Sequence, residues 1–130
     1  MAKQKILIAE NDKITQVLYR QGLPETMCEF KIVTDGEQAL AAYREWKPDI
    51  ILLEFFMPIL NGYQTLKSIR EGEKDKSTTI IMVTASSDQE NIVACAKIGV
   101  QGYILKPFKV DEIGVRIFKI HNSNKQKRHL

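Results

Sequence analysis

Five short apolar runs constrain the fold of this chain more than any other feature of its sequence. They recur at fairly even spacing and comprise Ile6–Ala9, Phe30–Val33, Ile50–Leu53, Ile80–Val83 and Tyr103–Leu105. The first, third and fourth runs are apolar at every position, which is typical of strands covered on both faces. We therefore expect a buried parallel sheet at the centre of the molecule.

The segments between these runs have the spacing of amphipathic helices. Two apolar stripes illustrate it, one formed by Ala39, Leu40, Tyr43 and Trp46 and the other by Ile113, Ile117 and Ile120. Strand and helix alternate five times, which predicts a doubly wound α/β sandwich.

Helix starts are indicated by short polar patterns. Thr34 with Glu37, and Ser87 with Glu90, match the Ser/Thr-x-x-Glu capping box. Asp12 precedes the segment after the first run, and we assign it to the cap of the first helix.

Length and composition indicate one ordinary globular domain. The chain has 130 residues, of which 44% are apolar and 27% charged, so disordered and collagen-like classes are excluded. The net charge of +3 is mild, and the one dense basic cluster, at Lys125, Lys127 and Arg128, is typical of a solvated tail. We expect a domain over residues 1–121, a polar basic tail over residues 122–130, and no nucleic-acid partner.

The two cysteines and the longest apolar stretch indicate a cytoplasmic protein. Cys28 and Cys95 are far apart, and Cys95 lies in an apolar pattern that predicts a reduced, buried thiol. The apolar stretch over residues 50–60 is interrupted by Glu54 and Pro58, so it cannot span a bilayer. The apolar run near the start is too short for a signal peptide. We therefore expect no membrane partner.

Polar residues collect where the predicted strands end. They are Glu10, Asn11 and Asp12 after the first strand, Glu54 after the third, Thr84 (followed by the small residue Ala85) at the end of the fourth, and Lys106 after the fifth. In an open α/β sheet this edge carries the working site. Because clustered carboxylates repel one another, a cation such as Mg²⁺ or a lysine is expected among them.

Four motifs in order resemble the receiver domains of bacterial two-component response regulators. They are the acidic opening Lys5–Asp12, the phosphoacceptor strand and loop Asp49–Gly62, the threonine strand Ile81–Ala85, and the aromatic and lysine strand Gly102–Phe108. The match covers nearly the whole chain. It implies a flavodoxin-like sheet of five parallel strands in the order 2-1-3-4-5, flanked by five helices, and a signalling domain that is not an enzyme.

The resemblance assigns a role to each strand-end residue. Glu10, Asn11, Glu54 and the backbone carbonyl of Phe56 correspond to the Mg²⁺ site, and Glu54 stands at the phosphate-accepting position. Thr84, Ala85, Tyr103 and Lys106 correspond to the residues that contact the phosphoryl group or switch with it. The Lys106–Pro107 bond resembles a peptide that receivers hold in cis.

Two of these positions depart from the family pattern. Glu54 replaces the usual aspartate with a longer side chain, and Asn11 replaces an acid with an amide that carries no charge. Both changes weaken phosphorylation, and we expect Mg²⁺ binding that is weak or absent. Glu54 either imitates phosphorylated aspartate by reaching Thr84 and Lys106, or belongs to a constitutive binding module. A conventional phosphorylatable regulator with an engineered or atypical Glu54 is the alternative.

A signalling protein is the expected partner: a sensor kinase, a phosphotransfer protein or a downstream effector. The output face that the resemblance implies spans residues 87–98, Tyr103 and residues 109–119, and Lys97, Lys109 and Lys119 make parts of it basic. A flavodoxin-like small-molecule binder is an alternative of another class. Its phosphate loop after the first strand is absent here, because Glu10, Asn11 and Asp12 would repel a phosphate.

Overall fold

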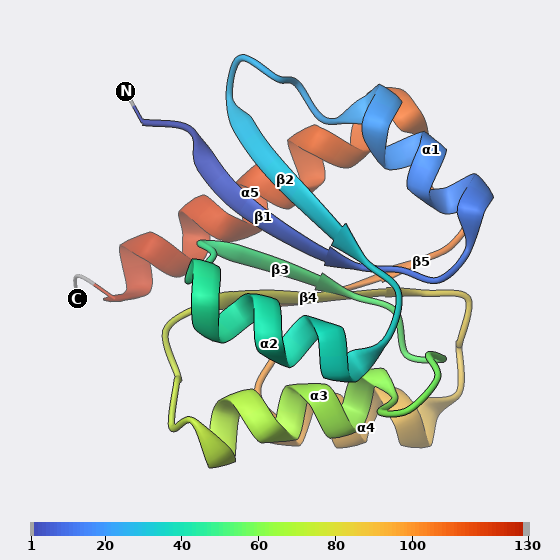
Figure 1. Cartoon of the computed structure of the whole chain (residues 1–130), viewed down its shortest axis with the longest axis vertical. Coiled ribbons are helices and arrows are strands. Elements are labelled where there is room, and N and C mark those ends of the chain that lie inside the picture. Colours follow the sequence, from blue (N-terminus) through green and yellow to red (C-terminus); the bar gives the residue numbers. More distant parts are fainter. Residues whose placement is uncertain (1, 129–130) are drawn as a thin grey trace.

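Five parallel strands form one sheet in the computed structural model, which describes residues 2–128 (Figure 1). The strands are β1 (Gln4–Ala9), β2 (Cys28–Val33), β3 (Ile50–Leu53), β4 (Thr79–Thr84) and β5 (Gly102–Leu105). Their order across the sheet is β2-β1-β3-β4-β5, and every neighbouring pair is parallel. The predicted strands and their order are confirmed.

Helices cover both faces of this sheet. They are α1 (Lys13–Gly22), α2 (Gly36–Trp46), α3 (Gly62–Lys67) with the π-helical turn η1 (Ser68–Gly72), α4 (Gln89–Ile98) and α5 (Val110–Arg128). In Figure 1, α1 and α5 lie on one face of the sheet, and α2, α3 and α4 lie on the other. The predicted α/β sandwich with five α-helices is confirmed.

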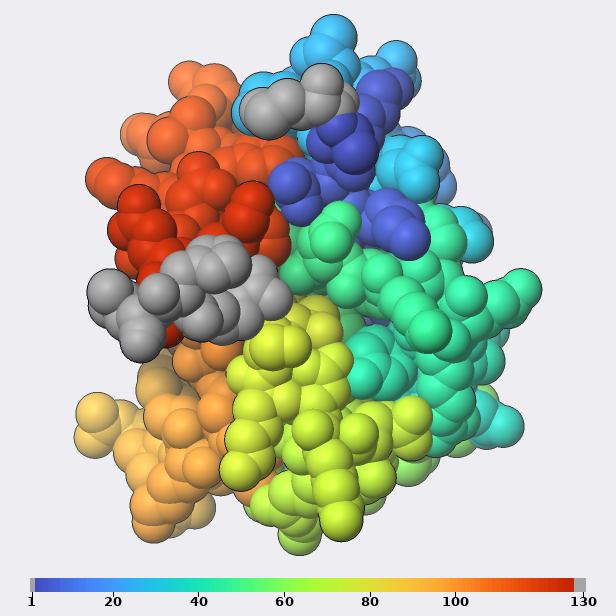
Figure 2. All heavy atoms as spheres, turned by 90° about the vertical axis from the view of Figure 1, so that its left-hand side faces the viewer, coloured from blue at the N-terminus to red at the C-terminus, as the bar shows by residue number. Residues whose placement is uncertain are grey.

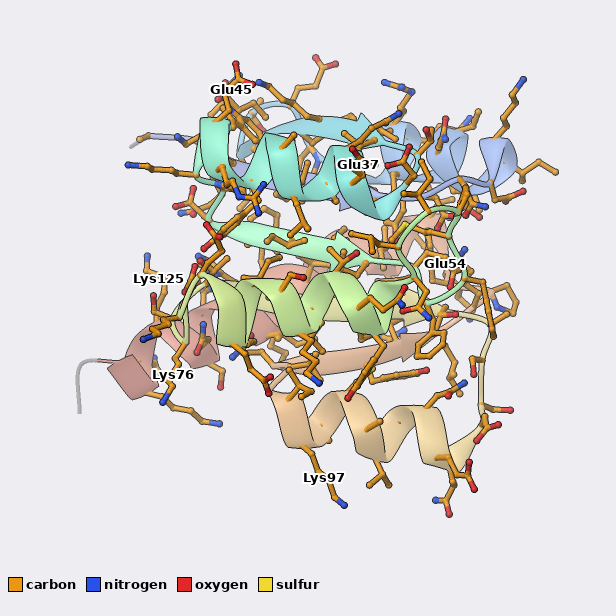
Figure 3. All side chains as sticks on the ribbon, turned by 60° about the horizontal axis from the view of Figure 1, so that its bottom comes forward. Glu37, Glu45, Glu54, Lys76, Lys97 and Lys125 are labelled. Atoms are coloured by element: carbon orange, nitrogen blue, oxygen red, sulfur yellow. The ribbon has the colours of Figure 1, made fainter. Side chains whose placement is uncertain are left out.

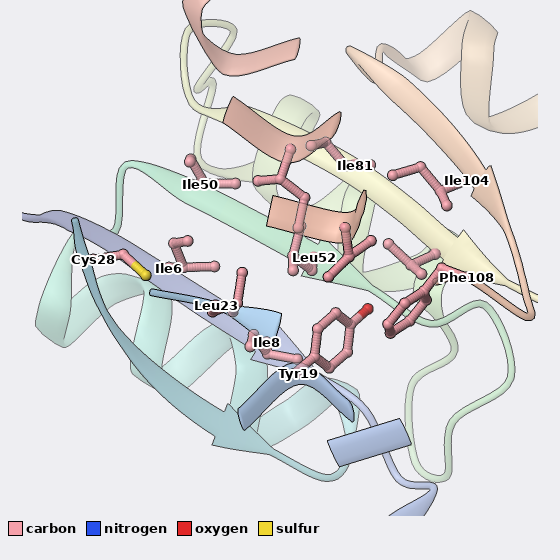
Figure 4. Packing of buried hydrophobic residues seen from close by; sticks show 13 residues of the cluster. Ile6, Ile8, Tyr19, Leu23, Cys28, Ile50, Leu52, Ile81, Ile104 and Phe108 are labelled. Atoms are coloured by element: carbon pink, nitrogen blue, oxygen red, sulfur yellow. The ribbon is translucent and has the colours of Figure 1, made fainter. Parts of the chain in front are cut away.

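Two apolar cores, one on each face, explain the continuous apolar runs. In β1, Ile6 and Ile8 face α1 and α5, whereas Leu7 and Ala9 face α2, α3 and α4, because successive strand side chains point to opposite faces. Figure 4 shows the first core, in which the ring of Tyr19 lies 5.0 Å from that of Phe108. Each fully buried large side chain contributes about 1.5–3 kcal/mol, so the two cores together stabilise the sheet on both faces.

The helix caps differ from the predicted ones by one residue. α2 begins after Asp35, whose carboxylate accepts a 2.7 Å hydrogen bond from an N–H of the first turn. α4 likewise begins after Asp88. The predicted caps Thr34 and Ser87 are wrong because an aspartate follows each hydroxyl residue, and a carboxylate is at least as strong a cap.

The last helix extends beyond the expected domain end. We expected a solvated tail from Asn122, but α5 continues to Arg128, and Asn124 is buried. Its side-chain amide donates to the Ser77 carbonyl at 3.0 Å and to Thr79 Oγ1 at 2.8 Å, which fixes the helix against the start of β4. Figure 2 shows this end of the molecule, where the N-terminal residues and the last turns of α5 both lie. Residues 129 and 130 of the expected tail lie outside the described residues.

Within residues 2–128, no helix combines the length and the apolar character needed to cross a bilayer.

Candidate functional site

Three charged side chains meet where the order of the strands reverses. β1 pairs with β2 on one side and with β3 on the other, and in sheets of this kind the working site lies beyond the carboxyl ends of these strands. Glu10 follows β1, Glu54 follows β3, and Lys106 follows β5. Figure 3 shows Glu54 at this end of the sheet and Lys76 and Lys125 at the opposite end.

Lys106 lies between the two glutamates. Its Nζ donates to Glu54 Oε1 at 2.7 Å and lies equally close, at 2.7 Å, to Glu10 Oε1. The contact with Glu10 has the distance of a salt bridge but not the angles of a hydrogen bond. Glu10 Oε1 is therefore the one buried side-chain polar atom in the described chain without a hydrogen bond. Glu10 is 1% and Glu54 7% exposed, so one ammonium neutralises two buried carboxylates only in part.

Burial and these charges shift the ionisation of the site. Burial raises the pKa of the Glu10 carboxyl, and the Lys106 ammonium and the Asp12 N–H offset this only in part. For Lys106, burial alone would lower the pKa, but the contacts with Glu10 and Glu54 outweigh burial and raise it. Lys106 is therefore held firmly as a cation.

The second oxygen of Glu54 is held by the backbone of the following loop. Glu54 Oε2 accepts hydrogen bonds from the N–H of Phe55 at 2.5 Å and of Phe56 at 3.2 Å. The loop is fixed by a 2.7 Å bond from the Gly62 N–H to the Phe55 carbonyl. A Cβ at Gly62 would lie 2.4 Å from the Glu54 carbonyl oxygen, so this position requires glycine. Both carboxylate oxygens of Glu54 are thus engaged.

The residues expected to switch contact Ser86 rather than Glu54. Thr84 is fully buried, and its Oγ1 accepts a 3.3 Å hydrogen bond from the Ser86 N–H. The Tyr103 hydroxyl donates to the Ser86 carbonyl at 3.1 Å. Among residues 2–128, no hydrogen bond joins Glu54 to Thr84 or Tyr103. Ser86 was missed from the sequence, because a serine in a polar loop carries no signal that it contacts Thr84 and Tyr103.

Two further features lie beside the site. Ala85 follows β4 directly and is exposed, and its expected contact with a phosphoryl group stays a prediction. The peptide bond between Lys106 and Pro107 is cis, as the resemblance implied.

The residues expected to bind Mg²⁺ fit the ion poorly. The side chain of Asn11 is exposed and has no hydrogen bond or ion pair in the described part of the chain. Asp12 caps α1 by accepting the Thr15 N–H at 2.9 Å, as predicted. The remaining expected ligands are the Phe56 carbonyl and the carboxylates of Glu10 and Glu54, and both carboxylates are paired with Lys106. Residues 2–128 contain no group of three or more His, Cys, Asp or Glu side chains placed to hold a metal. Mg²⁺ prefers several oxygen ligands in octahedral geometry, and this set supplies few of them.

Comparison with known proteins matches the receiver pattern. The family model for the response regulator receiver domain matches residues 6–118. The DNA-binding response regulator MtrA of Mycobacterium tuberculosis H37Rv is 33% identical over 120 residues, which cover 88% of this chain and 49% of MtrA. The chain thus spans about half the length of the curated relatives it matches.

Solved receiver structures share the fold. The receiver domain of the Francisella response regulator 1452 is 29% identical with a TM-score of 0.80, and the match covers 93% of this chain and 98% of that one. A CheY-like receiver domain protein from Methanospirillum hungatei has a TM-score of 0.87 at 21% identity, with 97% and 99% covered. The chain therefore belongs to the response regulator receiver domain family of two-component signalling.

Proposed function

We propose that this receiver domain binds its signalling partner without depending on phosphoryl transfer. Glu54 stands where the family carries its phosphate-accepting aspartate. The observation that carries the proposal is the double engagement of Glu54: one oxygen is paired with Lys106 and the other accepts two backbone N–H groups.

This arrangement opposes phosphorylation in two ways. A carboxylate must offer a free oxygen in line with the phosphoryl donor, and both oxygens of Glu54 are already hydrogen-bonded. The side chain is also one methylene longer than aspartate, and a misplacement of about 1 Å can slow such a reaction roughly a hundredfold. Receiver domains typically bind Mg²⁺ at this position, and we infer weak binding at most, because Lys106 is already paired with both carboxylates and Asn11 adds no third one.

The contacts of Glu54 favour a constitutive binding module over an imitation of phosphorylated aspartate. An imitation would have to reach both Lys106 and Thr84, and only Lys106 is contacted. A phosphoryl group also carries about −1.5 to −2 charges and three acceptor oxygens, so a carboxylate is a partial substitute. In our proposal Lys106 is paired permanently with Glu54, while Thr84 and Tyr103 keep their hydrogen bonds to the backbone of Ser86.

The partner is proposed from the family and from surface charge. Receiver domains interact with kinases and effectors, and we place the partner surface on α4, β5 and the first half of α5. Lys97 points outward from α4 (Figure 3), and Lys109 and Lys119 are exposed on or beside α5. An acidic partner surface fits this face. We further propose a cytoplasmic role in which this domain itself contacts neither nucleic acid nor membrane.

Phosphate acceptance tests the proposal. The native chain, Glu54→Asp and Asn11→Asp/Glu54→Asp are incubated with acetyl phosphate and Mg²⁺, and intact mass is measured. We expect no added phosphoryl group on the native chain, partial modification of the single variant, and fuller modification of the double variant, because Asn11→Asp adds a metal-binding carboxylate. Isothermal titration with Mg²⁺ should show tighter binding after Asn11→Asp alone.

Two outcomes would change the conclusion. A native chain that gains a phosphoryl group at Glu54 is a conventional phosphorylatable regulator with an atypical acceptor. A double variant that stays unmodified shows that the site has lost acceptance beyond these two positions, which leaves the binding module as the function.

A further inference from the structure

A polar hollow lies between the last turns of α5 and the start of β5, at the end of the sheet opposite to Glu54. It has a volume of about 360 Å³, which is within the range of sites for small ligands. Two exposed lysines of α5, Lys119 and Lys127, line it, and no carboxylate does so among the described residues. Figure 3 shows two further lysines, Lys76 and Lys125, at this end of the molecule. The hollow is therefore lined by positive charge that no carboxylate in its wall compensates.

The two lysines lie on one ridge of α5, with Ser123 midway between them. Residues four apart are neighbours on the surface of a helix, so Lys119, Ser123 and Lys127 follow one another along the wall of the hollow. At about 1.5 Å of rise per residue, the two lysines start about 12 Å apart along the helix. In the described part of the chain, neither lysine has an ion pair and the Ser123 hydroxyl has no hydrogen bond. These three side chains can therefore all donate to a ligand.

The facing wall holds an amide whose orientation is fixed. The side-chain oxygen of Gln101 accepts hydrogen bonds from Arg70 Nη2 at 2.9 Å and from the Ile80 N–H at 2.7 Å. Arg70 is itself buried and donates to three further oxygens. Within residues 2–128, the side-chain nitrogen of Gln101 has no hydrogen bond of its own, so its NH₂ group is left to donate to a ligand. The hollow thus contains a donor that is oriented before any ligand binds.

The chemistry of these donors favours phosphate over carboxylate. Lysine binds phosphate as a point charge, whereas carboxylates are typically held by the parallel N–H groups of arginine, and no arginine lines the hollow among residues 2–128. Hydroxyl and amide side chains also donate to phosphate oxygens. Val100 and Ile120 add an apolar patch on which an organic part of a ligand can lie. The spacing of the lysines calls for two anionic groups rather than one.

We propose that this hollow binds a small soluble molecule that carries two or more phosphate groups. Lys119 and Lys127 each bind one phosphate group. Ser123 and Gln101 donate to the phosphate oxygens between them. A concave site of this size suits a small molecule, whereas a bilayer or a protein surface would contact the exposed ridge of α5 instead.

Titration with inorganic pyrophosphate tests the site directly. Two-dimensional ¹⁵N–¹H spectra of the native chain are recorded at about 0.15 M NaCl in metal-free buffer, so that no metal ion can bring the probe to Glu54. We expect the amides of Gln101, Ser123 and Lys127 to shift with a dissociation constant below about 1 mM, while those of Glu54 and Lys106 stay unchanged. Inorganic phosphate and sulfate should bind at least about tenfold more weakly, because a single anionic group pairs with one lysine at a time.

Two substitutions on different walls remove separate contacts. Lys127→Gln should raise the dissociation constant about tenfold, the usual effect of losing a hydrogen bond to a charged group. Gln101→Glu keeps the oxygen that accepts from Arg70 and Ile80 but replaces the NH₂ group by a charged oxygen, so it should abolish binding. Lys125→Gln is the matched control, because it makes the same charge change on α5 at an exposed position that does not line the hollow.

The test is independent of the function proposed above. Neither Lys127 nor Gln101 belongs to the site around Glu54 or to the proposed partner surface, so each proposal can fail without the other. Urea unfolding checks that the variants are folded. Lys127 is exposed, so Lys127→Gln reports on the site even if Gln101→Glu lowers the stability of the fold.

Three results would overturn the proposal. The first is a native chain whose amides do not shift up to about 10 mM pyrophosphate. The second is an equal loss of affinity in Lys125→Gln and Lys127→Gln, which would mean that the basic end of the molecule attracts anions without a defined site. The third is a native chain that ignores pyrophosphate but sediments with vesicles that contain phosphatidic acid, because the phosphate would then belong to a lipid headgroup.

Discussion

Removing the ammonium of Lys106 should lower the free energy of unfolding, because two buried carboxylates would lose the positive charge between them. In the native chain, Lys106 Nζ lies 2.7 Å from a carboxylate oxygen of Glu10 and 2.7 Å from one of Glu54. In Lys106→Met the two carboxylates stay buried without this cation. Leaving a buried charge without its partner costs about 3–5 kcal/mol. We expect the lower end, about 3 kcal/mol of unfolding free energy at pH 7.5, because Glu10 can take up a proton. A domain of this size should remain folded.

The stability lost in Lys106→Met should be larger at pH 7.5 than at pH 5. Burial already raises the pKa of Glu10 above 4.5 in the folded state, and without Lys106 this pKa rises further. The folded variant then binds a proton more tightly than the unfolded chain does. The contribution of Glu10 to stability is therefore fully present below about pH 4.5 and is lost as the pH rises through the folded pKa of Glu10.

Urea unfolding followed by circular dichroism at pH 5 and pH 7.5 measures both effects. Lys109→Met is the matched control, because Lys109 has an exposed side chain with only a 3.9 Å contact to Glu112, and it should change stability by less than about 0.5 kcal/mol. A loss for Lys106→Met below about 1 kcal/mol at pH 7.5, or an equal loss at both pH values, would refute this reasoning.

Four other substitutions test the scaffold of the fold, each by urea unfolding. Arg70→Met should cost about 3 kcal/mol, because this 5% exposed guanidinium donates to four oxygens that would lose their partner; a loss below about 1 kcal/mol would contradict this. Asp35→Ala should lower the free energy of unfolding by about 1 kcal/mol, and Thr34→Ala by much less, because Asp35 caps α2. A larger loss for Thr34→Ala would show that Thr34 is the cap. Ile59→Asn should stabilise by about 1 kcal/mol, because Ile59 has φ 72° and is 68% exposed; a destabilised variant would show that this backbone is not strained.

The sheet was predictable because burial on both faces leaves a direct mark on the sequence. Ile50–Leu53 and Ile80–Val83 must be apolar at every position, whichever helices cover them. Cys95 was likewise predictable as a buried free thiol, because it lies in an apolar helical stripe. The caps predicted at Thr34 and Ser87 were wrong, because the aspartate that follows each of them caps a helix at least as well. Only the path of the backbone decides which of the two neighbours becomes the cap.

The contacts of the site were predictable only in part. The sequence indicated that Glu10, Glu54 and Lys106 gather at one edge, since parallel strands end together. It could not indicate that Glu54 turns one oxygen to the backbone of its own loop, because that depends on side-chain rotamers. Arg70 was missed for a similar reason: its partners Gly99 and Gln101 are distant in sequence, and an arginine in a helix is usually exposed.

The most direct test of phosphate-independent function is the response of the backbone amides to a phosphoryl donor. Two-dimensional ¹⁵N–¹H spectra are recorded for the native chain and for Asn11→Asp/Glu54→Asp, with and without acetyl phosphate and Mg²⁺. We predict that the amides of Thr84, Ala85 and Tyr103 stay unchanged in the native chain and shift in the double variant. A native chain in which these amides move when the donor is added would contradict the proposal that Glu54 has replaced phosphate control.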